Sequence, residues 1–216
     1  MTEAKLQSDP HSRDYVYVSA EHSHAHAYLL PCIESILSQR KRSEKLRVFD
    51  LGCGNGSVAN ALCALGHEVV GVDPSEQGIM EANRAYPELR LEKGSAYDPL
   101  AQRYDRFDAV VSLEVVEHVY APRVYARTLA DLIRPGGFAV ISTPYHGYWK
   151  NLALALTGKM DRHFTALWDN GHIKFWSVET LSSLLTEAGL EVREVHRVGR
   201  VPALAKSMVL VAEKTA

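Results

Sequence analysis

Three closely spaced glycines follow a short apolar run, and their spacing predicts a loop that holds a ligand against its backbone. They are Gly52, Gly54 and Gly56, and the acidic Asp50 lies just before them. Glycine lets the chain turn sharply and leaves room for a ligand beside the main chain. A dinucleotide-binding loop has the spacing GxGxxG and would need its third glycine at position 57, where the sequence has Ser57. The spacing therefore favours a ligand other than a dinucleotide, with a purely structural turn as the alternative.

A second acidic residue, Asp73, ends the next apolar run, Val69–Val72. If the two runs are neighbouring parallel strands, this carboxylate lies at the strand tip beside the glycine loop. An acidic side chain there can accept hydrogen bonds from both hydroxyls of a ribose. The two acids and the glycines together predict a site for a ligand that contains a ribose.

Histidines are concentrated in segments that can reach the same edge of the predicted sheet, because ligands of an open α/β sheet bind outside the carboxyl ends of its strands. Eight of the ten histidines belong to such segments: His11, His22, His24, His26, His118, His146, His163 and His172, but not His67 or His196. An imidazole titrates near neutral pH and can act as a general base. The candidates for a catalytic base are His118 first, then His146 and His172.

Aromatic side chains gather in two of the same segments, the N-terminal stretch and residues 145–176. Two segments that both carry Tyr and His, the second with Trp as well, predict a closed, mostly apolar pocket with a few polar groups. Such a pocket suits a flat acceptor such as a phenol, a quinol or a hydroxylated heterocycle, although some of these rings can simply form the core of the insertion. The candidate substrate contacts are Tyr15, Tyr17, Tyr145, Trp149 and Trp168.

Short apolar runs that alternate with helical patterns must position these residues. The runs are Leu46–Leu51, Glu68–Val72, Leu89–Glu92, Phe107–Leu113 and Phe138–Ser142. This alternation predicts a parallel sheet with helices on both faces. Two further runs, Leu190–Val198 and Ser207–Glu213, have only a loop between them and should pair antiparallel at the sheet edge. The expected fold is α/β: a doubly wound, Rossmann-like, seven-stranded mixed sheet with an antiparallel C-terminal strand, an N-terminal helical cap and a lid insertion after strand five.

The chain is expected to form a single domain over residues 1–216. Within it we expect an N-terminal cap segment (1–45), a cofactor-binding core (46–144), a lid or substrate insertion (145–176), and a C-terminal helix with antiparallel strands (177–216). The insertion is too long for an ordinary connection, and long loops of this kind usually serve as lids or binding elements.

The composition excludes several classes of protein. The 216 residues are 46% hydrophobic with a net charge of −2, which excludes a mainly disordered chain. The 24 basic residues are balanced by 26 acidic ones, so a nucleic-acid binder held by charge is not expected. No apolar run is long enough to span a bilayer, and the polar N-terminus does not resemble a signal peptide. We therefore expect a cytoplasmic protein that acts on a small molecule; its oligomeric state stays open.

The glycine triad, Asp50, Asp73 and the mixed sheet together resemble the class I S-adenosylmethionine-dependent methyltransferases. The resemblance implies that the glycine backbone lies against the methionine part of the cofactor and that Asp73 holds the ribose. It also implies that residues 94–96 lie near the adenine, where relatives often have an aspartate in place of Ser95. The implied cofactor-binding residues are Asp50, Gly52, Gly54, Gly56, Asp73, Ser95, Ala96 and Leu113.

The segment Glu114-Val-Val-Glu117-His118-Val resembles the ubiquinone-biosynthesis O-methyltransferases. In some of those enzymes the matching residues are assigned to a divalent metal, so the resemblance implies a magnesium ion on Glu114, Glu117 and His118. Two carboxylates and an imidazole could hold such a cation, which would lower the pKa of a bound hydroxyl. Two alternatives stay open: the Glu-His pair caps the loop and packs on the cofactor, or His118 acts alone as the base.

The predicted function is transfer of a methyl group from S-adenosylmethionine to a hydroxyl of a small aromatic or quinol-like acceptor. N-methylation and methylation of a sugar hydroxyl are the nearest variants, and a cofactor-binding regulatory protein is the alternative without catalysis. The stretch Leu152–Leu156 is predicted either to be a short helix that packs inward or, as the resemblance implies, to contact a membrane surface.

Overall fold

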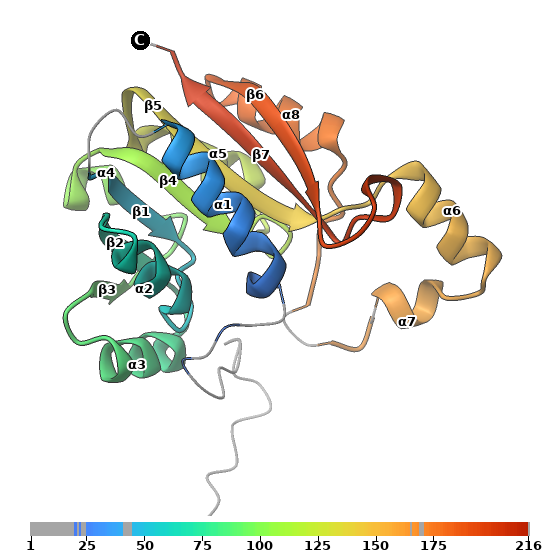
Figure 1. Ribbon diagram of the computed structural model, residues 1–216, viewed down its shortest axis with the longest axis horizontal. Coiled ribbons are helices and arrows are strands. Elements are labelled where there is room, and N and C mark those ends of the chain that lie inside the picture. The colour runs from blue at the N-terminus through green and yellow to red at the C-terminus, as the bar shows by residue number, and fades with distance from the viewer. Residues whose placement is uncertain are drawn as a thin grey trace, which may run out of the picture.

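A seven-stranded mixed sheet runs through the protein, as the sequence predicts (Figure 1). The computed structural model describes residues 20, 22, 25–40, 45–164, 166–168 and 171–215. The strands are β1 (Arg47–Leu51), β2 (Glu68–Asp73), β3 (Arg90–Lys93), β4 (Phe107–Leu113), β5 (Ile133–Pro144), β6 (Leu190–Val198) and β7 (Ser207–Lys214). Their order is β3-β2-β1-β4-β5-β7-β6. The first five strands are parallel, and β7 lies antiparallel between β5 and β6.

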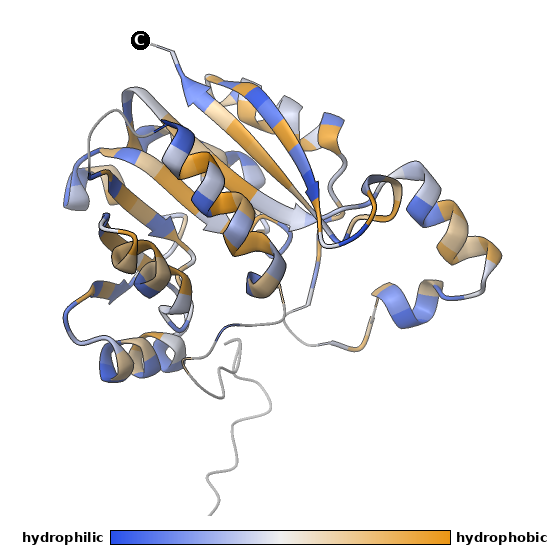
Figure 2. Cartoon of the chain, viewed as in Figure 1, coloured by the Kyte–Doolittle hydropathy of each residue, from blue (hydrophilic) through white to orange (hydrophobic). Residues whose placement is uncertain are grey.

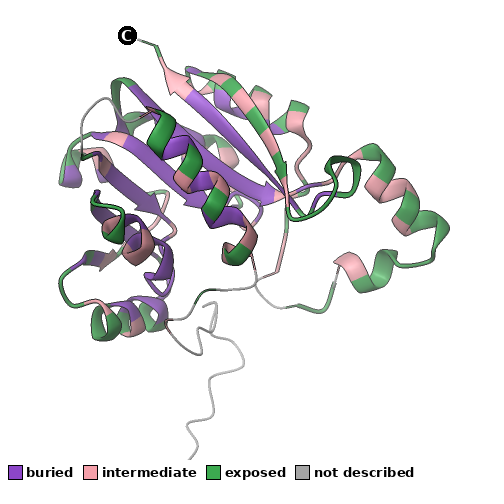
Figure 3. Cartoon of the chain, viewed as in Figure 1, coloured by how far each residue is buried: buried purple, intermediate pink, exposed green. Residues whose placement is uncertain are grey.

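Helices cover both faces of this sheet. They are α1 (His26–Arg40), α2 (Ser57–Ala64), α3 (Glu76–Ala85), α4 (Leu100–Tyr104), α5 (Pro122–Leu132), α6 (Tyr148–Leu156), α7 (Met160–Phe164) and α8 (Val178–Glu187). One buried cluster joins α1, α2 and α3 to one face, and a second joins α4, α5 and α8 to the other. Adjacent residues of β1 alternate between them: Val48 packs in the first cluster and Phe49 in the second. The central strands β1, β2, β4 and β7 are accordingly apolar and largely buried, whereas the edge strands β3 and β6 are partly exposed (Figures 2 and 3).

Beyond one-residue shifts at strand ends, the structure differs from the predicted elements in β5 and in two short helices. Strand β5 begins at Ile133 rather than Phe138, because Ile133 pairs with Phe107 before the register shifts and pairing resumes at Phe138. The helices α4 and α7 were not predicted, since five residues are too few to show a helical period.

The insertion after β5 has two unlike parts. Its outgoing part, α6 and α7, projects away from the sheet and has no buried side chain (Figures 1 and 3). Its returning part, residues 171–176, runs back to the loop that follows β4 and hydrogen bonds to it. Within the described part of the chain, no helix is long and apolar enough to cross a membrane.

Candidate active site

The glycine loop turns between β1 and α2 with all three glycines in the left-handed region. Their φ angles are +90° at Gly52, +51° at Gly54 and +76° at Gly56. The N–H of Gly52 donates to the carbonyl of Val72 at 2.9 Å, which ties the loop to β2. A Cβ atom added to Gly52 would lie 2.4 Å from Cγ2 of Val115. Glycine is therefore required there both for the backbone angle and for the close approach of the loop after β4.

Asp73, the last residue of β2, is hydrogen bonded to the glycine loop. Its Oδ2 accepts the N–H of Gly54 at 3.0 Å, and its Oδ1 accepts the N–H of Ser75 at 2.8 Å. Each carboxylate oxygen can accept more than one hydrogen bond. The carboxylate can therefore hold the loop and still receive hydroxyl groups of a ligand.

Asp50 is buried below the same loop, with 2% of its surface exposed. Its Oδ2 is buried without a hydrogen-bond partner among the described residues. Burial, together with the charge of Asp73, raises the pKa of Asp50 to about 7. A buried carboxylate oxygen that lacks a donor suits a cationic group of a ligand.

Side chains of the loop after β3 accept hydrogen bonds from the backbone of the same loop. The hydroxyl of Ser95 accepts the N–H of Tyr97 at 3.2 Å, and Asp98 Oδ2 accepts the N–H of Ser95 at 2.7 Å. The N–H of Gly94 donates to the carbonyl of Asp73 at 3.1 Å, so this loop adjoins the ribose-binding candidate. Asp98 was not among the predicted site residues.

Glu114 follows Leu113 at the end of β4 in a left-handed conformation, with φ at 56°. This backbone turn directs its carboxylate toward two serines: Ser142 Oγ donates to Oε1 at 2.8 Å, and Ser207 Oγ lies 3.4 Å from Oε2. Burial raises the pKa of Glu114 to about 7. A non-glycine residue in this region stores strain, and such residues cluster at functional sites.

Glu117 is more deeply buried, with 1% of its surface exposed. The hydroxyl of Thr143 donates to its Oε2 at 3.0 Å, while its Oε1 has no hydrogen-bond partner among the described residues. Burial and the nearby Glu114 raise the pKa of Glu117 well above its usual range. The structure thus leaves one carboxylate oxygen unpaired here, as it does at Asp50.

Three residues bring metal-binding atoms together beside this oxygen. Donor atoms of Glu117, His118 and His172 all lie within 4.8 Å of one another. His172 Nε2 lies 4.0 Å from Glu117 Oε1, and the two imidazole rings are 4.9 Å apart between centroids. The group therefore contains two members of the predicted metal trio, with His172 in the place predicted for Glu114. Burial is the main cause that lowers the pKa of His172 to about 4.

The returning part of the insertion positions His172. The N–H groups of Ile173 and Lys174 both donate to the carbonyl of Glu117, at 2.9 and 3.0 Å. The indole N–H of Trp176 donates to the carbonyl of Val116 at 3.0 Å, and His118 Nδ1 lies 3.2 Å from the carbonyl of Gly171. Trp176 was not among the predicted site residues, because its role depends on a hydrogen bond to the loop after β4, which is distant in sequence.

His146 belongs to a separate aromatic group on the insertion. Its ring lies against Phe164 and Phe175, at 5.8 and 5.1 Å between centroids. A pocket of about 400 Å³ opens there, lined by His146, Asn151, Phe164, Phe175, Ser177 and Thr180. Burial, more than the nearby Lys150, lowers the pKa of His146 to about 4.

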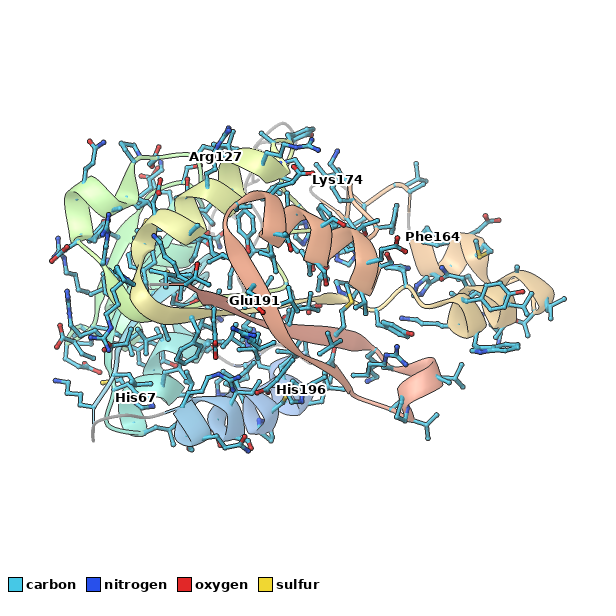
Figure 4. The ribbon with its side chains drawn as sticks, turned by 90° about the horizontal axis from the view of Figure 1, so that it is seen from above. His67, Arg127, Phe164, Lys174, Glu191 and His196 are labelled. Atoms are coloured by element: carbon cyan, nitrogen blue, oxygen red, sulfur yellow. The ribbon has the colours of Figure 1, made fainter. Side chains whose placement is uncertain are left out.

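The predicted substrate residues are found in different environments. Tyr145 is buried with Arg197 over its ring, Trp168 packs edge-on against His118, and Trp149 is 65% exposed. Tyr15 and Tyr17, like His11 and His24, lie outside the described residues. His67 lies at the opposite end of the molecule from Phe164, in agreement with its exclusion from the ligand edge (Figure 4).

Comparison with known proteins supports the resemblance seen in the sequence. A family model described as a methyltransferase domain matches residues 22–195. A ubiquinone biosynthesis O-methyltransferase from Ruegeria pomeroyi is 35% identical over 150 residues, which are 68% of this chain and 60% of that protein. One from Bradyrhizobium diazoefficiens is 38% identical over 116 residues, 52% of this chain and 45% of that protein. The matched segments thus span at most 60% of the length of these two relatives.

Solved structures agree on the fold. The magnesium protoporphyrin IX methyltransferase of Synechocystis PCC 6803 has a TM-score of 0.68 at 18% identity, covering 87% of this chain and 82% of that one. The YcgJ protein of Bacillus subtilis also has a TM-score of 0.68, at 14% identity, covering 87% and 99% of the two chains. At these identities the likeness shows the fold alone. Because the family model covers most of the sequence, we conclude that this chain belongs to the methyltransferase domain family, which confirms the predicted resemblance to class I methyltransferases.

Proposed function

We propose that the protein transfers the methyl group of S-adenosylmethionine to a hydroxyl of a small aromatic or quinol-like acceptor. The observation that carries this proposal is the pair of buried acids at the glycine loop. Asp73 is fixed to the loop by the N–H of Gly54, and Asp50 keeps one buried oxygen without a donor. The names of the relatives, which are O-methyltransferases, support oxygen as the acceptor atom.

The residues fit the cofactor in chemical type. S-adenosylmethionine supplies an electrophilic methyl group on a sulfonium and carries an ammonium and a ribose. The unpaired oxygen of Asp50 suits the ammonium, and the carboxylate of Asp73 at the tip of β2 suits the ribose hydroxyls. With the Ser95 hydroxyl engaged in its own turn, the backbone at Ala96 is our candidate for the adenine.

The chain must hold the acceptor oxygen in line with the reactive methyl group, at about 3 Å, and remove its proton. A phenol has a pKa near 10, so a base or a metal ion should assist at neutral pH. His118 and His172 lie together in the loop and insertion that follow β4 and β5, which makes them our candidates for this assistance. His146, in its separate aromatic group, is the next candidate for the base.

The donors that the described residues bring together differ from the predicted magnesium ligands. Glu114 is hydrogen bonded to Ser142 and lies near Ser207, and it is not in the group formed by Glu117, His118 and His172. The trio implied by the resemblance is therefore not assembled as a magnesium site.

A peripheral membrane contact by α6 is a further part of the proposal. Leu156 is 79% exposed and Trp149 65% exposed on a helix with Lys150 in its first turn. An exposed helix of this type can lie in a membrane interface, where it would meet an acceptor with a lipid tail. Sedimentation with anionic vesicles should recover the protein, and Trp149→Ser with Leu156→Ser should reduce the recovered fraction; equal recovery would contradict this contact.

The function is tested by methyl transfer from labelled S-adenosylmethionine to a panel of phenols, quinols and hydroxyquinolines. We expect transfer to at least one hydroxyl, and little transfer by Asp73→Ala. Transfer only to amines or sugars would favour the N-methyl or sugar variants. Binding of the cofactor without transfer to any acceptor class would favour a regulatory protein.

A further inference from the structure

We propose that Glu117, His118 and His172 form a binding site for a divalent transition-metal ion of the zinc type, in place of the magnesium site that the segment after β4 implies. The existence of this site is independent of the acceptor. Its use, to hold and acidify an acceptor hydroxyl, rests on the proposed methyltransferase function.

The spacing of the donors suits one shared ion. Zinc binds imidazole nitrogen and carboxylate oxygen at about 2.0–2.2 Å, so two ligands of a tetrahedral ion lie about 3.4 Å apart. His172 Nε2 is 4.0 Å from Glu117 Oε1, and the donor atoms of all three residues lie within 4.8 Å of one another. Small rotations of the two imidazole rings would bring them to ligand distance.

The unpaired oxygen of Glu117 is an independent indication of a ligand. The side chain is 1% exposed, and its Oε1 is buried without a hydrogen-bond partner among the described residues. Leaving a buried carboxylate oxygen unsatisfied is unfavourable, and a bound cation removes that cost. The oxygen lies on the side of His172, where the ion would bind.

Neighbouring groups orient two of the ligands, as is usual around protein metal ions. The hydroxyl of Thr143 donates to the other oxygen of Glu117 at 3.0 Å. His118 Nδ1 lies 3.2 Å from the carbonyl of Gly171, so a proton on Nδ1 would satisfy that carbonyl and direct Nε2 to the ion. The backbone bonds from Ile173 and Lys174 to Glu117 fix the position of His172.

The donor set selects the class of metal. Magnesium prefers six oxygen ligands in a regular octahedron, whereas imidazole suits zinc, iron and nickel. Two imidazoles and one carboxylate are the ligands of several catalytic zinc sites, which keep a further position for water or substrate. Glu114, the oxygen ligand that would favour magnesium, is instead directed to Ser142 and Ser207.

The proposal is tested by calorimetric titration of the chelator-treated full chain with zinc chloride and, separately, with magnesium chloride. We expect one zinc ion per chain and no competing magnesium binding. His172→Asn and Glu117→Gln should each weaken zinc binding by about tenfold or more. His163→Asn is the matched control, because His163 lies on the same insertion within a neighbouring ring cluster but outside the three donors, and it should leave the affinity unchanged.

Cobalt absorption gives a second readout that a structural role would not change. Cobalt bound in the same site should give visible bands that are lost in His172→Asn and kept in His163→Asn. Unaltered zinc affinity and cobalt spectra in His172→Asn, with its thermal midpoint also unaltered, would overturn the proposal. So would magnesium binding that displaces zinc. Zinc binding without methyl transfer would contradict the proposed function alone, and methyl transfer without zinc binding would contradict the site alone.

Discussion

Two pairs of acids lie at the carboxyl ends of strands, Asp50 and Asp73 within β1 and β2 and Glu114 and Glu117 just after β4, and they are held in different ways. Asp73 accepts one backbone N–H from Gly54 of the glycine loop and one from Ser75 of the turn after β2. Glu114 and Glu117 are held instead by hydroxyls from β5 and β7. Each pair keeps one buried oxygen without a partner among the described residues, at Asp50 and Glu117.

We call Asp50 and Asp73 the rigid pair and Glu114 and Glu117 the adjustable pair, because their partners differ in freedom to move. Backbone N–H groups cannot rotate away, so Asp73 of the first pair is preorganised for one ligand. Hydroxyls rotate and can exchange partners, and the second pair also depends on an insertion whose outgoing part has no buried side chain. We infer that cofactor binding belongs to the rigid pair and acceptor binding to the adjustable pair.

The largest expected effect comes from Gly52→Ala, which disturbs both pairs together. The new methyl would lie 2.4 Å from Val115, in the loop that carries Glu114 and Glu117, at a φ of +90°. We expect a loss of about 3 kcal/mol in the free energy of unfolding, since strain and overpacking add. Gly66→Ala is the matched control: its φ is +89° with nothing within 4 Å, so it should lose only about 1 kcal/mol. Urea unfolding measures both, and equal losses would contradict the close contact.

Asp73→Ala should remove one carboxylate of the rigid pair and leave the adjustable pair unaltered. Removing a carboxylate that is proposed to bind two ribose hydroxyls should weaken S-adenosylmethionine binding by about 100-fold, because hydrogen bonds to a charged group contribute about 1.5–3 kcal/mol each. Calorimetry measures the affinity, and the thermal midpoint shows whether the fold is kept. Glu76→Ala, an exposed acid paired with Lys93, should bind normally. Unaltered affinity in Asp73→Ala would contradict the ribose assignment.

Asp50 makes the rigid pair sensitive to pH. Its pKa is raised from 3.8 to about 7 in the folded protein, so the folded state holds a proton that the unfolded state has lost between these values. The contribution of Asp50 to stability therefore falls as pH rises from about 4 to about 7, and is constant above. Binding of a cationic cofactor favours the ionised form, so affinity should rise by up to about tenfold per pH unit below pH 7.

Asp50→Asn provides the control for this pH dependence. The amide does not titrate, so both the stability slope and the affinity slope below pH 7 should be smaller than in the parent chain. Stability and cofactor affinity are measured over the same pH series for both proteins. Identical slopes in the two proteins would show that Asp50 is not the group that titrates.

The smallest effect concerns the adjustable pair and its insertion. Trp176→Phe removes the N–H that donates to Val116 and should lower the free energy of unfolding by about 1 kcal/mol. We expect a higher KM for the acceptor with cofactor affinity unaltered. Trp149→Phe, on the exposed α6, should leave stability unaltered. A loss of cofactor affinity in Trp176→Phe would remove the distinction between the two pairs.

The rigid pair and most of the sheet could be predicted from the sequence because they depend on contiguous residues. The glycine spacing, Asp50 and Asp73 all lie at the ends of apolar runs that form β1 and β2. The partners of Glu114 could not be predicted in this way. Ser207 reaches it only because β7 pairs with β5 in a register that sets Ser207 opposite Pro144.

His172 was recognised as a candidate base but not as the neighbour of Glu117. That placement depends on two backbone hydrogen bonds between the insertion and the loop after β4. Backbone hydrogen bonds of this kind cannot be predicted from residue types. The start of β5 at Ile133 also could not be predicted from apolar runs. It depends on a register shift in the pairing of β5 with β4.

The position of β7 has a consequence for biosynthesis. It follows β6 in the sequence, yet it lies between β5 and β6 and brings Ser207 to Glu114. A ribosome that stops before Ser207 releases a chain with a complete glycine loop but with the edge of β5 uncovered. Open strand edges promote aggregation. A chain without β7 should therefore aggregate more readily than a chain in which this edge is covered.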